Sequence, residues 1–224
     1  MKSPLTIYSG ITGDSKMLAA FSESGQLVRL FWPHIDYGQH MEEFRAALIL
    51  APPESPGWLD RPGWSHRQEY QPGTNSLTTF SRHEGLSVAV EATAYCPPGE
   101  DCLIIDYRIV NEEPLPRRIQ FAVYECFRIN ESAYYTTAMM NEGAGCLVFY
   151  HRNVAIALAS NLAPSGFHCG VRHEESSALT ALKRRALRGT SIQHKSPDGA
   201  ISWDLGRMVY GESRWFTLFV ATGT

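Results

Sequence analysis

Apolar and polar residues alternate with a period of two along most of this chain. Between Leu103 and Val110, for example, every second residue is large and apolar. Successive side chains of a β-strand point to opposite faces, so this period is typical of half-buried strands. The alternating segments are Leu86–Ala94, Leu103–Val110, Ile119–Ile129, Leu147–Tyr150, Ala155–Ala159, Gly166–Val171 and Arg214–Ala221.

The breaks between these segments contain residues that favour chain reversal. Strands that recur at short intervals with no helix between them pair antiparallel and form a sandwich or barrel. About a dozen or more strands are too many for an immunoglobulin-sized sandwich. The sequence therefore predicts an all-β chain, with one large antiparallel two-sheet β-sandwich as a single domain over residues 1–224. The expected turns lie at Ser24-Gly25, Pro97–Gly99, Asn111–Pro114, Asn141–Gly143, Pro197–Gly199 and Gly211–Ser213.

One segment, Glu174 to Arg188, has a helical period instead. It contains no Gly or Pro, acidic residues stand at its start, basic residues at its end, and Gly189 follows. Its apolar residues recur with a 3.6 period, which predicts one short amphipathic helix over the sandwich. The basic residues at its end are either a solvated face or a patch for phosphate or a partner: Lys183, Arg184, Arg185 and Arg188.

Composition excludes several function classes. The net charge is −3, with 20 basic and 23 acidic residues, so no basic excess would attract nucleic acid or an anionic membrane. The longest apolar runs have about six residues, whereas a membrane-spanning helix needs about 20. The stretch from Met1 to Gly10 lacks the apolar core of a secretion signal, so we expect a cytoplasmic location.

The five cysteines are odd in number and form no C-x-x-C motif. Most lie in apolar strand-like segments, where a thiol behaves as a small buried hydrophobe. We expect reduced packing residues at Cys96, Cys102, Cys126, Cys146 and Cys169.

The densest polar cluster runs from Trp32 to Glu42. His34, Asp36, His40 and Glu42 share residue parity, so an extended chain would present them on one side. Two histidines with carboxylates are plausible ligands for a divalent metal. However, Pro33 and Gly38 interrupt the extension, and the spacing matches no zinc signature. We predict no metal here, and a loop that makes hydrogen bonds at an interface or at the rim of a cleft.

The stretch from Ala51 to Gly73 is rich in Pro, Gly and Trp and is predicted as a long loop. Loops of this length are usually functional or ordered by a partner. Trp58 and Trp64 could stack on a sugar ring, or they could fix the loop to the sandwich or to a neighbouring domain.

Motifs for catalysis are absent. The sequence has no G-x-S-x-G and no phosphate-binding glycine loop. Glu42 and Glu43 are adjacent, so in an extended segment they would point to opposite faces and could not act as a hydrolytic pair. Glu125 shares a strand face with apolar residues, and we expect it to pair with an arginine, the alternatives being a sheet edge or a perturbed pKa. No catalytic residue and no cofactor is predicted.

Several stretches resemble the N-terminal domain of prokaryotic glucoamylases and glucodextranases, which belong to glycoside hydrolase family 15. In that family a G-N-G-x-x-L strand opens the domain, and here Gly13-Asp14-Ser15 stands in place of the G-N-G. The stretches that carry the resemblance are Gly10–Gly25, Leu27–Asp36, Asn111–Pro114, Asp198–Gly206 and Tyr210–Phe219.

The resemblance implies a β-supersandwich like that of mutarotases, followed in the same polypeptide by an (α/α)6 barrel. In the family that barrel holds both catalytic glutamates, so no catalytic residue is carried over to this chain. Trp32, His34, Asp36, His40 and Glu42 would then be interface or cleft-rim residues facing the barrel. Because the chain ends at Thr224 just after a strand, we expect a domain boundary there.

Three functions follow as hypotheses. The first is a non-catalytic N-terminal domain that packs against a glucan-hydrolysing barrel, with an apolar patch near Trp32, Trp58 and Trp64. The second is a stand-alone carbohydrate-binding module, with α-glucan oligosaccharides as its ligands. The third is a mutarotase-like or epimerase enzyme, which would need a histidine acid, His34 or His40, and Glu125 as base.

Overall fold

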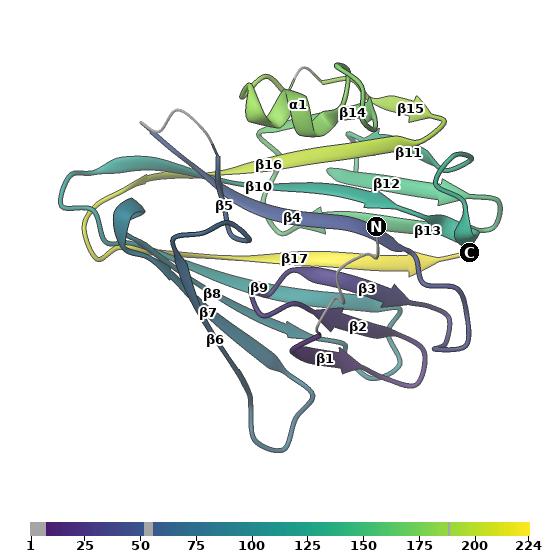
Figure 1. Ribbon diagram of the computed structural model, residues 1–224, viewed down its shortest axis with the longest axis horizontal. Helices are drawn as coiled ribbons and strands as arrows, with labels where there is room; N and C mark the ends of the chain where they lie inside the picture. The colour runs from purple at the N-terminus through teal and green to yellow at the C-terminus, as the bar shows by residue number, and fades with distance from the viewer. Residues whose placement is uncertain (1–7, 52–55, 188) are drawn as a thin grey trace.

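A computed structural model describes residues 8–51, 56–187 and 189–224, and more than half of these residues lie in the strands of antiparallel β-sheets. A nine-stranded and a five-stranded sheet form the two large layers, and a three-stranded sheet lies beside them. Most of the long strands lie along roughly the same axis in Figure 1, and those at one end of the nine-stranded sheet are inclined to it, as expected for the packing of twisted sheets. The prediction of a large antiparallel β-sandwich with one short helix is confirmed.

The nine-stranded sheet contains most of the strands that the alternation predicts. Its order is β15-β11-β12-β13-β17-β9-β8-β7-β6. The bounds are β6 Trp64–Tyr70, β7 Leu77–His83, β8 Val88–Tyr95, β9 Cys102–Asn111, β11 Thr137–Asn141, β12 Cys146–His151, β13 Val154–Ser160, β15 Ile192–His194 and β17 Ser213–Gly223.

The five-stranded sheet has the order β14-β16-β10-β4-β5, and the small sheet has the order β1-β2-β3. The bounds are β4 Met41–Leu50, β5 Gly57–Trp58, β10 Arg117–Phe127, β14 Gly166–Val171 and β16 Pro197–Met208 in the first, and β1 Gly10–Gly13, β2 Leu18–Phe21 and β3 Leu27–Phe31 in the second. Two short 3-10 helices also occur, η1 Glu84–Leu86 and η2 Ile129–Glu131.

The main core lies between the two large sheets. Leu103, Ile105 and Ile109 of β9 are buried on one face, as their spacing predicts. β10 is central and is buried on both faces, since Phe121 faces the main core while Tyr124 packs beneath the helix in a second cluster. Burial on both faces follows from the helix, which covers the outer side of this sheet.

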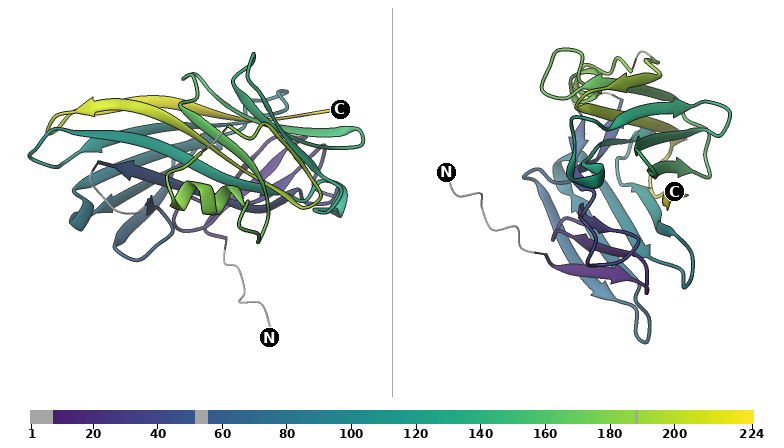
Figure 2. Two further views of the ribbon diagram at one scale, coloured as in Figure 1. Left: turned by 90° about the horizontal axis from the view of Figure 1, so that it is seen from above. Right: turned by 90° about the vertical axis from the view of Figure 1, so that its right-hand side faces the viewer.

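The helix α1 spans Ala178–Lys183 and lies across β16, β14 and β10 (Figure 2). It is shorter than the predicted segment from Glu174 to Arg188. Ser177 caps its N-terminus, because its side chain accepts a hydrogen bond from the Leu179 amide, and Arg185 has a left-handed φ of 54° that ends the helix. Arg188 lies outside the described residues.

Two predicted irregular segments turn out to be strands. The expected long loop from Ala51 to Gly73 contains β5 and β6, although residues 52–55 are not described. β6 is the sheet edge and alternates weakly, which explains why its sequence did not indicate a strand. Pro197-Asp198-Gly199 is not a turn but the start of β16, where a proline is tolerated.

All five cysteines are free thiols, and three of them are buried. Burial is the main cause that raises the pKa of Cys96, Cys126 and Cys169 to about 12. The predicted packing role is confirmed for these three. Within the described residues no helix is long and apolar enough to cross a membrane.

Candidate functional site

The connection between β3 and β4 forms one wall of a surface hollow of about 340 Å³. The opposite wall is η2, which follows β10. The hollow therefore lies where the polar cluster predicted from the sequence meets a second segment almost a hundred residues further along the chain. Its lining residues are Asp36, Tyr37, Gly38, His40, Asn130 and Glu131.

Backbone conformation brings the two walls together. Asn130 and Glu131 have left-handed φ values of 51° and 60°, which turns the chain sharply after β10. Gly38 faces this turn, and a Cβ there would lie 3.1 Å from Cγ of Glu131. The amide of Arg128 donates a hydrogen bond to the His40 carbonyl over 2.7 Å, which joins the base of the loop to the end of β10.

His40 and Trp32 are buried at the base of this loop. The His40 Nε2 atom lies 2.8 Å from the Trp32 carbonyl oxygen, and the Trp32 Nε1–H donates to Asp101 over 2.9 Å. Burial lowers the pKa of His40, and the contact with the Trp32 carbonyl offsets only part of this effect. The neutral imidazole then donates from Nε2, so these two predicted site residues hold the loop in place.

The tip of the loop is exposed and carries apolar side chains. His34, Asp36, Ile35 and Tyr37 all face solvent there. Tyr135 stacks on His151, whose backbone oxygen accepts a hydrogen bond from the side chain of Asn130 over 3.1 Å. We define the loop face as Ile35, Asp36, Tyr37, Asn130, Glu131, Tyr134, Tyr135 and His151.

Glu42 lies on β4 rather than in the loop. Arg172 binds it over 3.0 Å and binds the adjacent Glu43 over 3.3 Å. The expectation that these two glutamates point apart is wrong, because the pairing of β4 with β10 shifts register at this point. Such a bulge adds one residue and turns neighbouring side chains to the same side.

The parity pattern therefore does not gather a metal site. Among the described residues no three His, Cys, Asp or Glu side chains are grouped so that they could hold a metal ion.

Glu125 is fully buried in β10, and both of its carboxylate oxygens lack a hydrogen-bond partner. Burial raises the pKa of this carboxyl well above its usual value. No arginine is paired with it among the described side chains, so the expected ion pair is wrong and the alternative of a perturbed pKa holds. The reason is its position on a central strand, where the side chain faces the apolar core.

The two tryptophans predicted to contact sugar lie in different environments. Trp58 is only 7% exposed, and the Arg45 guanidinium lies 4.3 Å from its ring centroid. Trp64 is half-buried between His66 and His83. Trp32 and Trp58 are covered by the protein itself, so these two side chains do not contribute to the expected apolar patch. Sugar stacking at Trp64 stays a prediction.

The exposed aromatic residues of the loop face were missed in part. Tyr134 and Tyr135 stand between two alternating segments and follow no period, and their adjacency outside a strand was the only available signal. Nothing in the sequence indicated that Arg172 pairs with Glu42 and Glu43, because these partners are about 130 residues away along the chain.

Comparison with known proteins gives one relative in sequence. No family model matches the chain. It is 26% identical over 203 residues to the uncharacterized glycosyl hydrolase MJ1610 of Methanocaldococcus jannaschii. The match covers 88% of this chain but 31% of the relative.

Solved structures define the class of fold. A bacterial glucoamylase complexed with acarbose matches with a TM-score of 0.78 at 13% identity, over 97% of this chain and 32% of that one. A GalM/aldose epimerase homologue from C. elegans matches with a TM-score of 0.61 at 8% identity, over 96% of this chain and 98% of that one. The chain thus has a mutarotase-like β-sandwich fold, and it spans about one third of the glucoamylase and of the archaeal relative.

Proposed function

We propose that the chain is the non-catalytic, N-terminal β-sandwich domain of a glucoamylase-like hydrolase of glycoside hydrolase family 15. The observation that carries this proposal is the coverage of the matches. Almost the whole chain aligns with about one third of a glycosyl hydrolase and with about one third of a glucoamylase structure. A domain that accompanies a separate catalytic unit explains both proportions. A cytoplasmic location remains part of the proposal.

The loop face is the surface proposed to contact the catalytic barrel. It combines exposed apolar and aromatic side chains, Ile35, Tyr37 and Tyr135, with the exposed acidic residues Asp36 and Glu131. Aromatic residues are enriched at protein interfaces, and polar residues commonly surround them. His34 and Asp36 keep their predicted role as interface or rim residues within this proposal.

The side-chain geometry gives the mutarotase alternative little support. An epimerase acid and base must reach one sugar. His40 is buried and engaged by the Trp32 carbonyl, while Glu125 lies inside the core. The two groups therefore do not open onto a common pocket. Polarimetry of freshly dissolved glucose would test this alternative, and mutarotation at the buffer rate is the expected result.

The first experiment is to read the gene beyond the codon for Thr224. The proposal expects an open frame of several hundred codons with repeated amphipathic helices. A stop codon directly after Thr224 would overturn it.

The second experiment uses the full polypeptide and the 224-residue chain side by side. Replacing Tyr37 and Tyr135 by alanine should lower the Tm of the full polypeptide and leave the Tm of the 224-residue chain unchanged, because these side chains would be buried only against the barrel. Tyr210→Ala, an exposed tyrosine outside the loop face, is the matched control and should change neither. Equal shifts in both proteins would contradict the proposal.

A further inference from the structure

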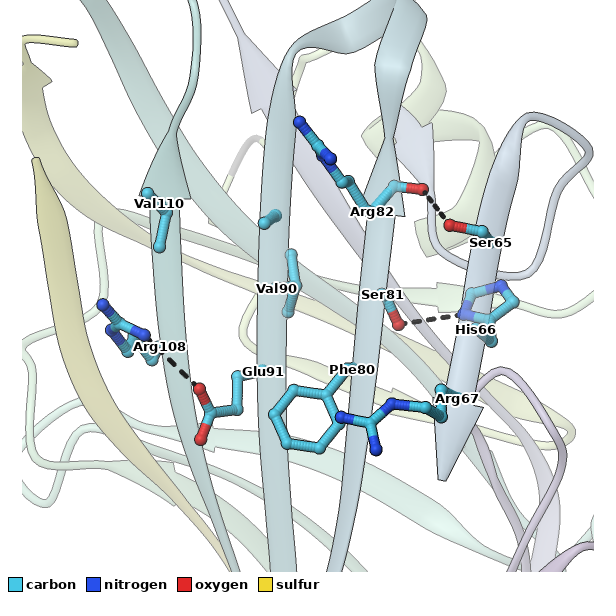
Figure 3. Close-up of a pocket in the computed structure, with 11 residues that line it drawn as sticks. Ser65, His66, Arg67, Phe80, Ser81, Arg82, Val90, Glu91, Arg108 and Val110 are labelled. Carbon is cyan, nitrogen blue, oxygen red and sulfur yellow. Dashed lines mark hydrogen bonds and ion pairs between the residues drawn. The ribbon is translucent and has the colours of Figure 1, made fainter. Parts of the chain in front are cut away.

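A second hollow, of about 490 Å³, lies over strands β6 to β9 (Figure 3). Val88, Val90 and Ile109 of these strands point into the core, so the residues between them point outward. Glu91 and Arg108 belong to this outward set. The hollow is therefore on the outer face of the nine-stranded sheet, and it shares no residue with the loop face.

Five side chains form one straight row across this face. Arg67 is paired with Phe80, Phe80 with Glu91, Glu91 with Arg108, and Arg108 with Trp215 of β17. Neighbouring strands are about 4.8 Å apart, so the row is about 19 Å long. This length matches a few linked pyranose rings. We call these five residues the cross-strand row.

Small side chains beside the row create the hollow. Ala89 and Val110 pair with each other on the same outer face, two residues along the strands from Glu91 and Arg108, and they line the hollow. Arg82 belongs to the same second row, because it pairs with Ser65 on one neighbouring strand and with Ala89 on the other. The hollow thus follows from a row of long side chains lying parallel to a row that contains short ones.

Every arginine at the hollow is matched by a carboxylate. Arg67 pairs with Glu69, Arg82 with Glu112 over 2.9 Å, and Arg108 with Glu91 over 3.5 Å. The local net charge is therefore zero, which does not favour an anionic ligand. Each guanidinium has five N–H donors, and an ion pair uses only some of them. The remaining donors can bind a ligand next to a carboxylate that accepts hydrogen bonds. Donor and acceptor side by side suit the vicinal hydroxyl groups of a sugar.

Aromatic rings complete the row at two points. The Arg67 guanidinium lies 4.5 Å from the Phe80 ring centroid, and the Arg108 guanidinium lies 5.5 Å from that of Trp215. Trp215 is 62% exposed, although the next residue on the strand, Phe216, is in the core. An exposed tryptophan held by a neighbouring arginine offers a rigid apolar surface to a ring.

We propose that the cross-strand row is a binding site for a neutral oligosaccharide. Glu91 and Arg108 would exchange hydrogen bonds with hydroxyl groups, and Trp215 would contact the apolar face of a pyranose. The site goes beyond the proposed accessory role, since a domain could support a catalytic barrel without binding sugar.

The test is a titration of the 224-residue chain with maltopentaose, isomaltotriose, cellopentaose and, as an anionic probe, trigalacturonate. Calorimetry and tryptophan fluorescence report binding. We expect one of the neutral sugars to bind, and Trp215→Ala to weaken its affinity at least tenfold. Glu91→Gln should also weaken it, since a carboxylate accepts stronger hydrogen bonds than an amide. Trp215 is exposed, and glutamine keeps the size and shape of Glu91, so at most small changes in Tm are expected.

Tyr210→Ala is the matched control, because it removes an exposed aromatic ring elsewhere and should leave the affinity unchanged. The proposal is overturned if no neutral sugar binds, if only trigalacturonate binds, or if Trp215→Ala binds as well as the parent. None of these results bears on the accessory role, which the reading frame and the loop-face variants test separately.

Discussion

The Ser177 hydroxyl donates a hydrogen bond to Oδ2 of Asp198 over 2.6 Å, and this contact fixes the start of α1 to the start of β16. The other carboxylate oxygen accepts from the Ala178 amide over 2.8 Å. Asp198 is fully buried, and it therefore satisfies one of the free amides at the N-terminus of the helix from a neighbouring strand.

Asp198→Ala should therefore destabilise the protein. The change leaves the Ala178 amide and the Ser177 hydroxyl without their partner in a buried place, which costs about 2–4 kcal/mol. The free energy of unfolding in urea, followed by circular dichroism, measures this loss. Asp36→Ala is the control at an exposed aspartate and should change the value little; equal effects of the two changes would contradict the capping role.

Glu125 should make the protein less stable as the pH rises. Its pKa in the folded state is raised above the usual 4.5 by burial, so the folded protein keeps the proton while the unfolded chain loses it. The contribution of the protonated Glu125 to the free energy of unfolding is fully present below pH 4.5. It is lost as the pH rises from there through the folded-state pKa. Urea unfolding of the parent and of Glu125→Gln from pH 4 to pH 8 measures the difference.

Glu125→Gln cannot ionise, so its unfolding free energy should decrease less over this range than that of the parent. The exposed Glu100 provides the control, since Glu100→Gln should keep the parent's dependence on pH. Parallel curves for the parent and Glu125→Gln would show that the carboxyl is not buried as described.

Strand positions could be predicted from the sequence because a half-buried strand shows its period locally. Predicted and observed bounds of β9, Leu103–Val110 against Cys102–Asn111, differ by one residue at each end. Asp198-Gly199 was misinterpreted because its cause is not local. A Cβ at Gly199 would lie 2.6 Å from Leu147, so this glycine provides room for a core side chain rather than a turn.

The candidate sites depended more on contacts between distant segments. The bulge that turns Glu42 and Glu43 toward Arg172 arises from the pairing of β4 with β10, and no residue in the polar cluster indicates it. The alternation over Arg214–Ala221 places Trp215 on the strand face opposite to Phe216, but only the strand pairing shows that Arg108 lies beside it. A local sequence pattern thus predicts which face of a strand a residue occupies, whereas the residues that meet in a site can be identified only from the pairing of the strands.

Arg172 should contribute to stability through its two carboxylates. Its side chain is 18% exposed and those of Glu42 and Glu43 are 30% exposed, so the pairs are better shielded from water than surface pairs. Arg172→Met removes the guanidinium that pairs with both glutamates and should lower the free energy of unfolding by about 1–3 kcal/mol. Arg184→Met, whose partner Glu175 is 94% exposed, is the control and should have almost no effect in the same urea titration.

His40 should weaken the base of the loop face in acid. Burial lowers its folded-state pKa below the usual 6.5, so the unfolded chain takes up a proton before the folded protein does. The stability contribution is complete above pH 6.5 and is lost as the pH falls through the folded-state pKa. Protonation would also add a proton to Nδ1, and this buried atom has no hydrogen-bond partner among the described residues.

His40→Gln retains a donor for the Trp32 carbonyl but cannot take up this proton. Its unfolding free energy should therefore decrease less than that of the parent between pH 7 and pH 5, measured by urea unfolding at each pH. His34→Gln removes an exposed imidazole from the same loop and should follow the parent. If His34→Gln flattened the curve and His40→Gln did not, the acid sensitivity would belong to the tip of the loop and not to its buried base.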